Sequence, residues 1–106
     1  MNDLNNFGLS EKAMELIFRV FKGFPEVEKV IIFGSRAEDN FKPGSDIDLV
    51  IKGENIDNSM AEVIRNLLQE GLYLPYFFDV LDYKSIKNEK LKSHIDLYGV
   101  VFYEKR

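Results

Sequence analysis

Apolar residues recur along the chain with two different spacings, and these predict where helices and strands lie. Helical spacing starts after Ser10, a favourable N-cap residue, and stops at Gly23 and Pro25. It returns over residues 59–70 and 88–98, whereas short apolar runs of strand length occupy residues 30–33, 49–51, 76–82 and 100–103. We expect the last of these runs to form an edge strand.

Because helical and strand segments alternate, the sequence predicts an α/β (α+β) fold in which helices pack on a small mixed sheet. Its 106 residues suffice for one domain with its own core, spanning residues 1–106, with residues 1–8 as a loose polar lead-in. Apolar residues make up 45% of the chain, which is normal for a folded domain.

Charge and composition exclude several classes of protein. The net charge of −4 gives no basic surface for a long nucleic acid, which disfavours a polymerase. The chain has no cysteine, so disulfides and thiolate metal sites are excluded. Residues 1–6 lack the apolar core of a signal peptide, and no apolar run reaches the length of a membrane span. We therefore expect a cytoplasmic protein without membrane contact.

Candidate chemistry gathers where two predicted strands meet. The first apolar strand ends in Gly34-Ser35, and after ten further residues Asp46-Ile47-Asp48 opens the second. Along a strand, side chains two residues apart share a face, so Asp46 and Asp48 project together. Two adjacent carboxylates repel unless a cation neutralises them, and Mg²⁺ prefers carboxylate oxygens and substrate phosphates as ligands.

The glycine–serine turn supplies groups that a phosphate needs. Gly34 has no Cβ, so a phosphate can approach the backbone, and Ser35 offers a hydroxyl and an amide. Arg36 adds a forked cation, although it could equally pair with the acidic residues at 38–39. Ser45, directly before the two aspartates, is a turn residue or a minor ligand. Together these groups predict a site for a metal-bound nucleoside triphosphate.

An acidic residue interrupts the predicted strand at 76–82. Asp79 stands between Phe78 and Val80, where a buried, unpaired carboxylate is costly and a metal ion offsets that cost. If this strand neighbours the one opened by the two aspartates, Asp79 completes a cluster of three carboxylates. Asp82 is the competing candidate, but it lies three residues further on and faces the opposite side. We assign Asp82 to strand-end or helix capping.

Other candidate groups have structural interpretations. Taken alone, Asp46 and Asp48 would be turn-capping residues without a metal. His94 is the only histidine, and it fits a surface or half-buried helix position better than a metal site, which needs several ligands. Tyr73 and Tyr76 either form a contact surface for another protein or pack on the chain's own core.

The joint motif resembles the signature of the DNA polymerase β-type nucleotidyltransferase superfamily. The glycine–serine pair, the ten-residue spacing and the Asp-x-Asp motif match it, and the likeness covers roughly residues 27–106. The short length and the Gly-Ser-Arg-Ala opening are most similar to minimal nucleotidyltransferases, which are often paired with a helical HEPN-domain partner as antitoxin and toxin. One departure is Asp39, which stands where these proteins often have glycine; aspartate tolerates left-handed backbone angles.

The resemblance implies a two-metal nucleotidyltransferase in which Asp46, Asp48 and Asp79 hold two Mg²⁺ ions. Asp79 would also accept the proton of the attacking hydroxyl, while Gly34 and Ser35 hold the β- and γ-phosphates. The resemblance further implies ATP as donor, transfer of AMP, and a tyrosine hydroxyl of a HEPN-type toxin as acceptor. Because no acceptor domain is recognisable, the acceptor surface is expected from a partner or from a second copy in a homo-oligomer.

Two alternatives to this enzyme stay open. One is a non-catalytic, nucleotide-binding antitoxin that neutralises its toxin by forming a complex. The other is a small-molecule nucleotidyltransferase, which the missing acceptor domain disfavours. The clustering of three carboxylates favours the active enzyme, because a purely structural role gives no reason to gather them.

Overall fold

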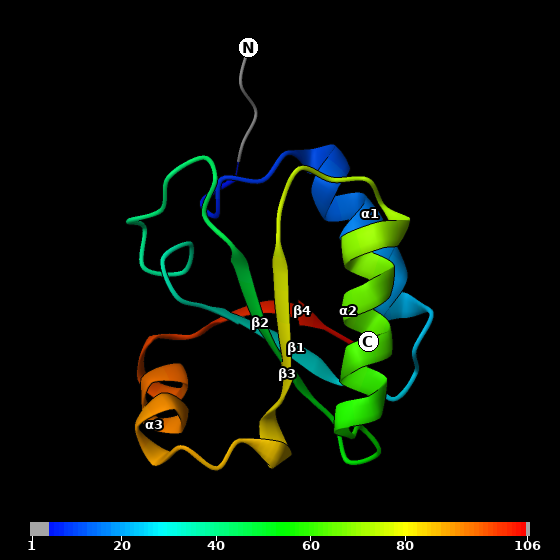
Figure 1. The fold of residues 1–106 in the computed structure, drawn as a ribbon, viewed down its shortest axis with the longest axis vertical. Helices are drawn as coiled ribbons and strands as arrows, with labels where there is room; N and C mark the ends of the chain where they lie inside the picture. Colours follow the sequence, from blue (N-terminus) through cyan, green and yellow to red (C-terminus); the bar gives the residue numbers. More distant parts are fainter. Residues whose placement is uncertain (1–4, 106) are drawn as a thin grey trace.

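The protein is built around a four-stranded mixed sheet with the strand order β3-β2-β1-β4 (Figure 1). The structure, a computed structural model, describes residues 5–105. Within these residues the elements are α1 (Glu11–Lys22), β1 (Lys29–Phe33), β2 (Ile47–Lys52), α2 (Asn58–Gly71), β3 (Phe78–Asp82), the 3-10 helix η1 (Tyr83–Ser85), α3 (Glu89–Tyr98) and β4 (Val100–Glu104). The predicted fold class is confirmed, and β4 is the expected edge strand.

Strand direction brings distant segments to one end of the sheet. β1 is antiparallel to both β2 and β4, whereas β2 and β3 are parallel. Consequently the end of β1 and the start of β3 lie on either side of the start of β2. In the register, Asp48 pairs with Phe33 on one side and with Asp79 on the other.

Helices cover both faces of the sheet, as the alternating strand side chains require. On one face, Val30 and Ile32 belong to the larger core, which also contains Ile17 of α1 and Ile64 of α2. On the other face, a smaller core packs the helix α3 against the sheet; it contains Ile31, Phe33, Val50 and Ile95. Figure 1 shows α1 and α2 on one side of the strands and α3 on the other.

Helix boundaries follow the predicted caps. The Ser10 hydroxyl accepts a hydrogen bond from the amide of Ala13 at the start of α1, and Gly23 is the C-cap. Asn88 caps α3 by accepting from the amides of Lys90 and Leu91. These caps place the helix ends within a residue or two of the sequence-based boundaries.

The lead-in before α1 is more ordered than expected. Residues 1–4 lie outside the described part, but the remainder of the predicted loose segment is folded back on the protein. The Asn5 side chain accepts hydrogen bonds from the amides of Phe7 and Leu9. The ring of Phe7 packs against that of Phe102, with centroids 5.7 Å apart. The sequence suggested a loose tail because its polar residues do not reveal these local turns.

The third strand starts later than its apolar run predicted, at Phe78 instead of residue 76. The side chain of Gln69 on α2 donates to the carbonyl of Tyr76 and accepts from the amide of Phe78. A side-chain amide therefore satisfies the backbone here in place of a strand partner.

No helix within residues 5–105 is both long and apolar enough to cross a membrane.

Candidate functional site

The residues singled out from the sequence meet at one end of the sheet. The turn beginning at Gly34 follows β1, Asp46 directly precedes β2, and Asp48 and Asp79 lie side by side on β2 and β3. Figure 1 shows β2 and β3 starting at this end, next to the loop that follows β1. The predicted neighbourhood of the two acidic strands is therefore observed.

The two halves of the motif are in direct contact. Gly34 has a φ of +79°, a left-handed conformation that side chains disfavour. A Cβ built at Gly34 would lie 2.5 Å from Oδ2 of Asp48, so any larger residue would displace the carboxylate. The structure thus gives two reasons for glycine at position 34: the left-handed backbone conformation and the proximity of the Asp48 side chain. The sequence had suggested a third reason, close approach of a phosphate to the backbone.

The three carboxylates influence one another electrostatically. Burial raises the pKa of Asp48 above its usual value, and the charges of Asp79 and then Asp46 raise that pKa further. Asp48 is half-buried, whereas Asp46 and Asp79 are exposed. A divalent cation would relieve this repulsion, because it interacts favourably with all three charges at once.

The three carboxylates are suitable ligands for a hard cation, although within residues 5–105 their side chains do not point to one common position. All three groups are carboxylates, which are the ligands that Mg²⁺ prefers. Within residues 5–105, no group of three or more His, Cys, Asp or Glu side chains lies close enough together to hold a metal ion. Rotation of the exposed Asp46 and Asp79 side chains is needed to complete such a site.

Asp79 is exposed, contrary to the prediction that it is buried in its strand. Its neighbours Phe78 and Val80 are buried, as expected. The difference arises because side chains alternate along β3, so Asp79 lies on the face opposite to Phe78 and Val80, which pack in the core beneath α2. The energetic argument from burial is therefore wrong for Asp79, but its position next to Asp48 does not depend on it.

Asp82, the competing acid, is 2% exposed and caps the 3-10 helix η1. Its carboxylate accepts hydrogen bonds from the amide of Lys84 and the hydroxyl of Ser85. The capping role assigned from the sequence is confirmed.

The turn after β1 has helical geometry over its first residues. The carbonyl of Gly34 accepts from the amides of Ala37 and Glu38. Asp39 adopts a φ of 60°, the left-handed angle that aspartate tolerates. Ser35 is half-buried within this turn.

A contact of His94 connects this turn with α3, the helix that packs on the sheet face formed by Phe33 and Val50. The Nε2 of His94 lies 3.0 Å from Oε2 of Glu38, and both side chains are partly exposed. This matches the predicted half-buried helix position, and it gives Glu38 a partner that the sequence did not indicate.

Arg36 differs from both sequence-based alternatives. It is 1% exposed, and its guanidinium donates hydrogen bonds to backbone carbonyls: 2.7 Å to Phe7, 3.3 Å to Pro43, and 2.9 and 3.1 Å to Ser45. None of the ion pairs among the described residues involves Arg36, so the expected pairing with Glu38 or Asp39 is wrong. With its donors facing carbonyls, the guanidinium is not directed at a phosphate either.

Ser45 has the turn role that was one of its two interpretations. Its hydroxyl accepts a hydrogen bond from the amide of Lys42, and its own amide donates to the carbonyl of Lys42. These bonds close the turn that contains Pro43 and Gly44, two residues that favour turns.

The two tyrosines of the loop between α2 and β3 lie in different surroundings. Tyr76 packs on the chain itself, with the Arg36 guanidinium 5.0 Å from its ring centroid. Tyr73 is 92% exposed and holds a φ of 54°, which is uncommon for a residue with a side chain. Phe77 is 69% exposed in the same loop. Its exposure was not anticipated, because an apolar residue in a strand-like run gives no sign of lying outside the sheet.

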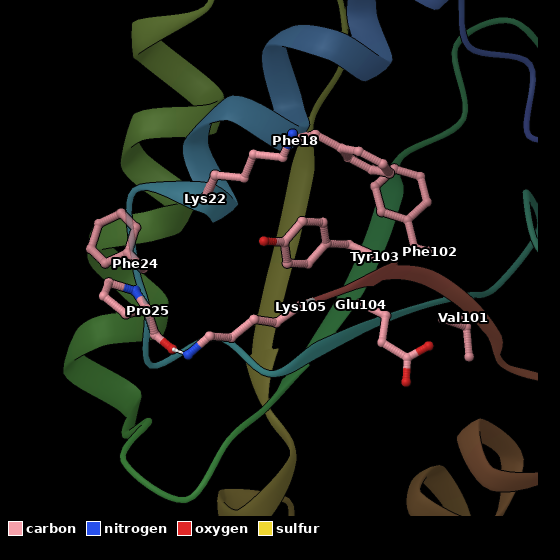
Figure 2. A pocket seen from close by; sticks show the side chains of 9 residues that line it. All are labelled: Phe18, Lys22, Phe24, Pro25, Val101, Phe102, Tyr103, Glu104 and Lys105. Atoms are coloured by element: carbon pink, nitrogen blue, oxygen red, sulfur yellow. Dashed lines mark hydrogen bonds between the residues drawn. The ribbon is translucent and has the colours of Figure 1, made fainter.

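A large cavity lies away from these residues. It measures about 1020 Å³ and opens between α1 and the edge strand β4; Figure 2 shows its lining residues Phe18, Lys22, Phe24, Pro25, Val101, Phe102, Tyr103, Glu104 and Lys105. It shares no residue with the predicted site. The carboxylates therefore occupy an open end of the sheet and not the floor of this cavity.

Comparison with known proteins agrees with the motif. The profile of the family described as "Polymerase beta, Nucleotidyltransferase" matches residues 15–106. A comparison with curated protein sequences finds no match.

Several solved structures share the fold. A toxin–antitoxin structure with AMP-PNP has a TM-score of 0.70 and 19% identity, over 88% of this chain and 74% of that one. A tri-AMPylated Shewanella oneidensis HEPN toxin in complex with its MNT antitoxin has a TM-score of 0.65 and 18% identity, over 90% and 72%. A putative nucleotidyltransferase from Sulfolobus solfataricus has a TM-score of 0.53 and 28% identity, over 88% and 78%.

Proposed function

Because the chain belongs to the polymerase β-type nucleotidyltransferase family, we propose that it transfers AMP from ATP to a hydroxyl of a partner protein. The observation that carries the proposal is the register of the two parallel strands, which sets Asp79 beside Asp48. Asp46 and the turn at Gly34 lie at the same end of the sheet. Nucleotidyl transfer needs this combination of clustered carboxylates and a turn that can hold phosphates.

Asp46, Asp48 and Asp79 would hold two Mg²⁺ ions. The raised pKa of Asp48, caused by burial and by the other two carboxylates, is the electrostatic condition that a bound cation would relieve. When bound, such ions neutralise the triphosphate and stabilise charge on the entering and leaving oxygens.

The chain's own groups would bind the donor and handle the proton. The turn at Gly34 and Ser35 holds the β- and γ-phosphates through its backbone and hydroxyl. The acceptor oxygen forms a bond to the α-phosphorus while the bond from that phosphorus to the β-phosphate oxygen breaks, and pyrophosphate leaves. Asp79, exposed on its strand, accepts the proton of the acceptor hydroxyl.

A helical HEPN-type toxin is the proposed acceptor. The support is the fold shared with a toxin–antitoxin structure containing AMP-PNP and with the complex of an AMPylated HEPN toxin. The exposed Tyr73 and Phe77 lie in the loop that leads into β3, and we assign them to contact with this acceptor. This pairing would make the chain the antitoxin of the two proteins.

Transfer of label tests the proposal. Wild-type protein is incubated with Mg²⁺, ATP labelled on the α-phosphate, and the HEPN-type protein encoded beside it. Label should appear on the partner with wild type and with the surface variant Glu62→Gln, and should be absent with Asp48→Asn. Absence of label with wild type would overturn the proposal.

The second candidate is an antitoxin that acts by binding alone. The observation in its favour is that, within residues 5–105, no three acidic side chains converge tightly enough to hold an ion. It predicts that Asp48→Asn neutralises the toxin as well as wild type does. Size-exclusion chromatography of the chain alone and with its partner would also show whether it forms a homo-oligomer.

A further inference from the structure

Arg36 is a buried cation, and no acidic side chain within residues 5–105 forms an ion pair with it. Burial lowers its pKa, and electrostatic interactions with Tyr76 and Asp46 only partly offset this. Its hydrogen bonds all end on neutral carbonyls, and none of the described ion pairs includes it. Burying a charged group without an ion-pair partner costs free energy of folding, so the contacts of the Arg36 guanidinium need an explanation.

Those contacts join segments that are far apart in the sequence. The Phe7 carbonyl belongs to the lead-in before α1, and the carbonyls of Pro43 and Ser45 belong to the loop before β2. Arg36 itself lies in the turn that begins at Gly34. The Arg36 side chain thus connects the turn that begins at Gly34 to the loop that precedes Asp46 and β2.

The bonds to Ser45 are the ones that reach the site. Nε and one terminal nitrogen of Arg36 both donate to the Ser45 carbonyl, at 3.1 and 2.9 Å. That carbonyl belongs to the peptide unit shared with Asp46. A peptide plane held by two donors cannot rotate freely, so the direction in which Asp46 leaves the backbone is fixed.

We propose that Arg36 is a positioning residue that aims the Asp46 carboxylate by clamping the Ser45–Asp46 peptide, and that it does not touch the nucleotide. The role of Asp46 as a ligand rests on the proposed function, whereas the clamp itself is a property of the fold.

Aromatic packing keeps the guanidinium in place. Its central carbon lies 5.1 Å from the ring centroid of Phe41 and 5.0 Å from that of Tyr76. Gly8, at a φ of +76°, allows the lead-in to pass close to this group, because a Cβ there would lie 2.9 Å from an Arg36 nitrogen. Arginine side chains form planar, fork-shaped donors, so lysine could keep the charge but not this set of bonds.

Arg36→Lys and Arg36→Gln test the proposal, with Arg19→Gln as an exposed arginine control. Two measurements are made on each: hydrogen–deuterium exchange of residues 37–46, and kcat together with ATP affinity in the transfer assay. Both Arg36 variants should exchange faster in this loop while β1 and β2 stay protected. Their kcat should fall roughly 10- to 100-fold, as for loss of a group that orients a metal ligand. ATP affinity should change by less than about 3-fold.

A different pattern would overturn the proposal. If exchange in residues 37–46 matches the control, while ATP affinity falls in Arg36→Gln and is kept in Arg36→Lys, the guanidinium contacts phosphate. If wild type transfers no label, the proposed function fails, and the exchange measurement alone decides whether the clamp exists. Should the Arg36 variants not fold, Tyr76→Leu removes one packing face and is judged by the same readouts: faster loop exchange supports the clamp, and unchanged exchange refutes it.

Discussion

Asp48 on β2 and Asp79 on β3 are register partners in the parallel pair of strands. Neighbouring residues on parallel strands point to the same face, so two carboxylates that are 31 positions apart in the sequence share one small volume. The charge of Asp79 contributes to the raised pKa of Asp48, after burial. The folded protein thus keeps carboxylates that repel each other in close proximity. Such destabilising arrangements are typical of functional sites.

Asp48→Asn should abolish transfer while leaving the fold intact. Asparagine keeps the shape of the side chain but removes the charge that a cation needs, so kcat should fall by at least about 100-fold. Steady-state transfer assays with purified partner measure this. A variant that retains more than a tenth of wild-type activity would show that Asp48 is not a metal ligand.

The same substitution should stabilise the protein in a pH-dependent manner. The pKa of Asp48 is raised in the folded state, so the folded protein binds a proton more readily than the unfolded chain does. Ionised Asp48 therefore destabilises the fold at every pH above its folded pKa. The penalty disappears as the pH falls through the folded pKa toward the unfolded value near 3.9.

Urea unfolding of wild type and Asp48→Asn at neutral pH and at about pH 4 measures this difference. Asp48→Asn should be the more stable protein at neutral pH, and its advantage should shrink at the acid pH. Asp79→Asn should also increase the free energy of unfolding at neutral pH, because it removes one of the charges that raise the pKa of Asp48. A neutral-pH loss of stability in both variants would contradict the electrostatic account.

Gly34→Ala should destabilise the protein and impair transfer. The new Cβ would meet the Asp48 carboxylate, and the φ of +79° adds strain of about 1–3 kcal/mol. Gly44→Ala is the matched control in the same loop, since a Cβ there meets nothing within 4 Å. Thermal unfolding of both variants gives the comparison, and equal melting temperatures would contradict the prediction.

Tyr73→Gly should separate stability from acceptor binding. Glycine adopts the φ of 54° without strain, so stability should stay the same or rise by up to about 1 kcal/mol. If Tyr73 contacts the acceptor, the KM for the partner protein should rise while ATP affinity stays constant. Leu97→Ala, at a site 75% exposed on α3, is the control for loss of a surface apolar group. An unchanged KM would remove Tyr73 from the acceptor surface.

The sequence predicted those parts of the site that depend on short-range rules. Helix caps such as Ser10 follow from residue type, and the shared direction of Asp46 and Asp48 follows from strand periodicity. The contact between the two halves of the motif depends on more than this, because β1 and β2 must be adjacent and antiparallel to place Phe33 opposite Asp48.

The features that escaped prediction depend on tertiary position. Asp79 is exposed because it lies on the face of β3 opposite to the buried Phe78 and Val80, and the apolar pattern does not show which part of each face a helix covers. Arg36 is held by the carbonyl of Phe7, 29 positions away, and a charged residue after a glycine–serine pair gives no indication of burial. For both residues, the surroundings inferred from the sequence were wrong, and their roles in the site stay predictions.

The outer position of β3 bears on which acceptors could take part in the proposed reaction. A strand with a neighbour on only one side leaves its other flank accessible from bulk solvent, and Asp79 stands on that strand. A hydroxyl on the surface of another folded macromolecule can therefore reach this carboxylate from the free flank, without first being extended or threaded into a cleft.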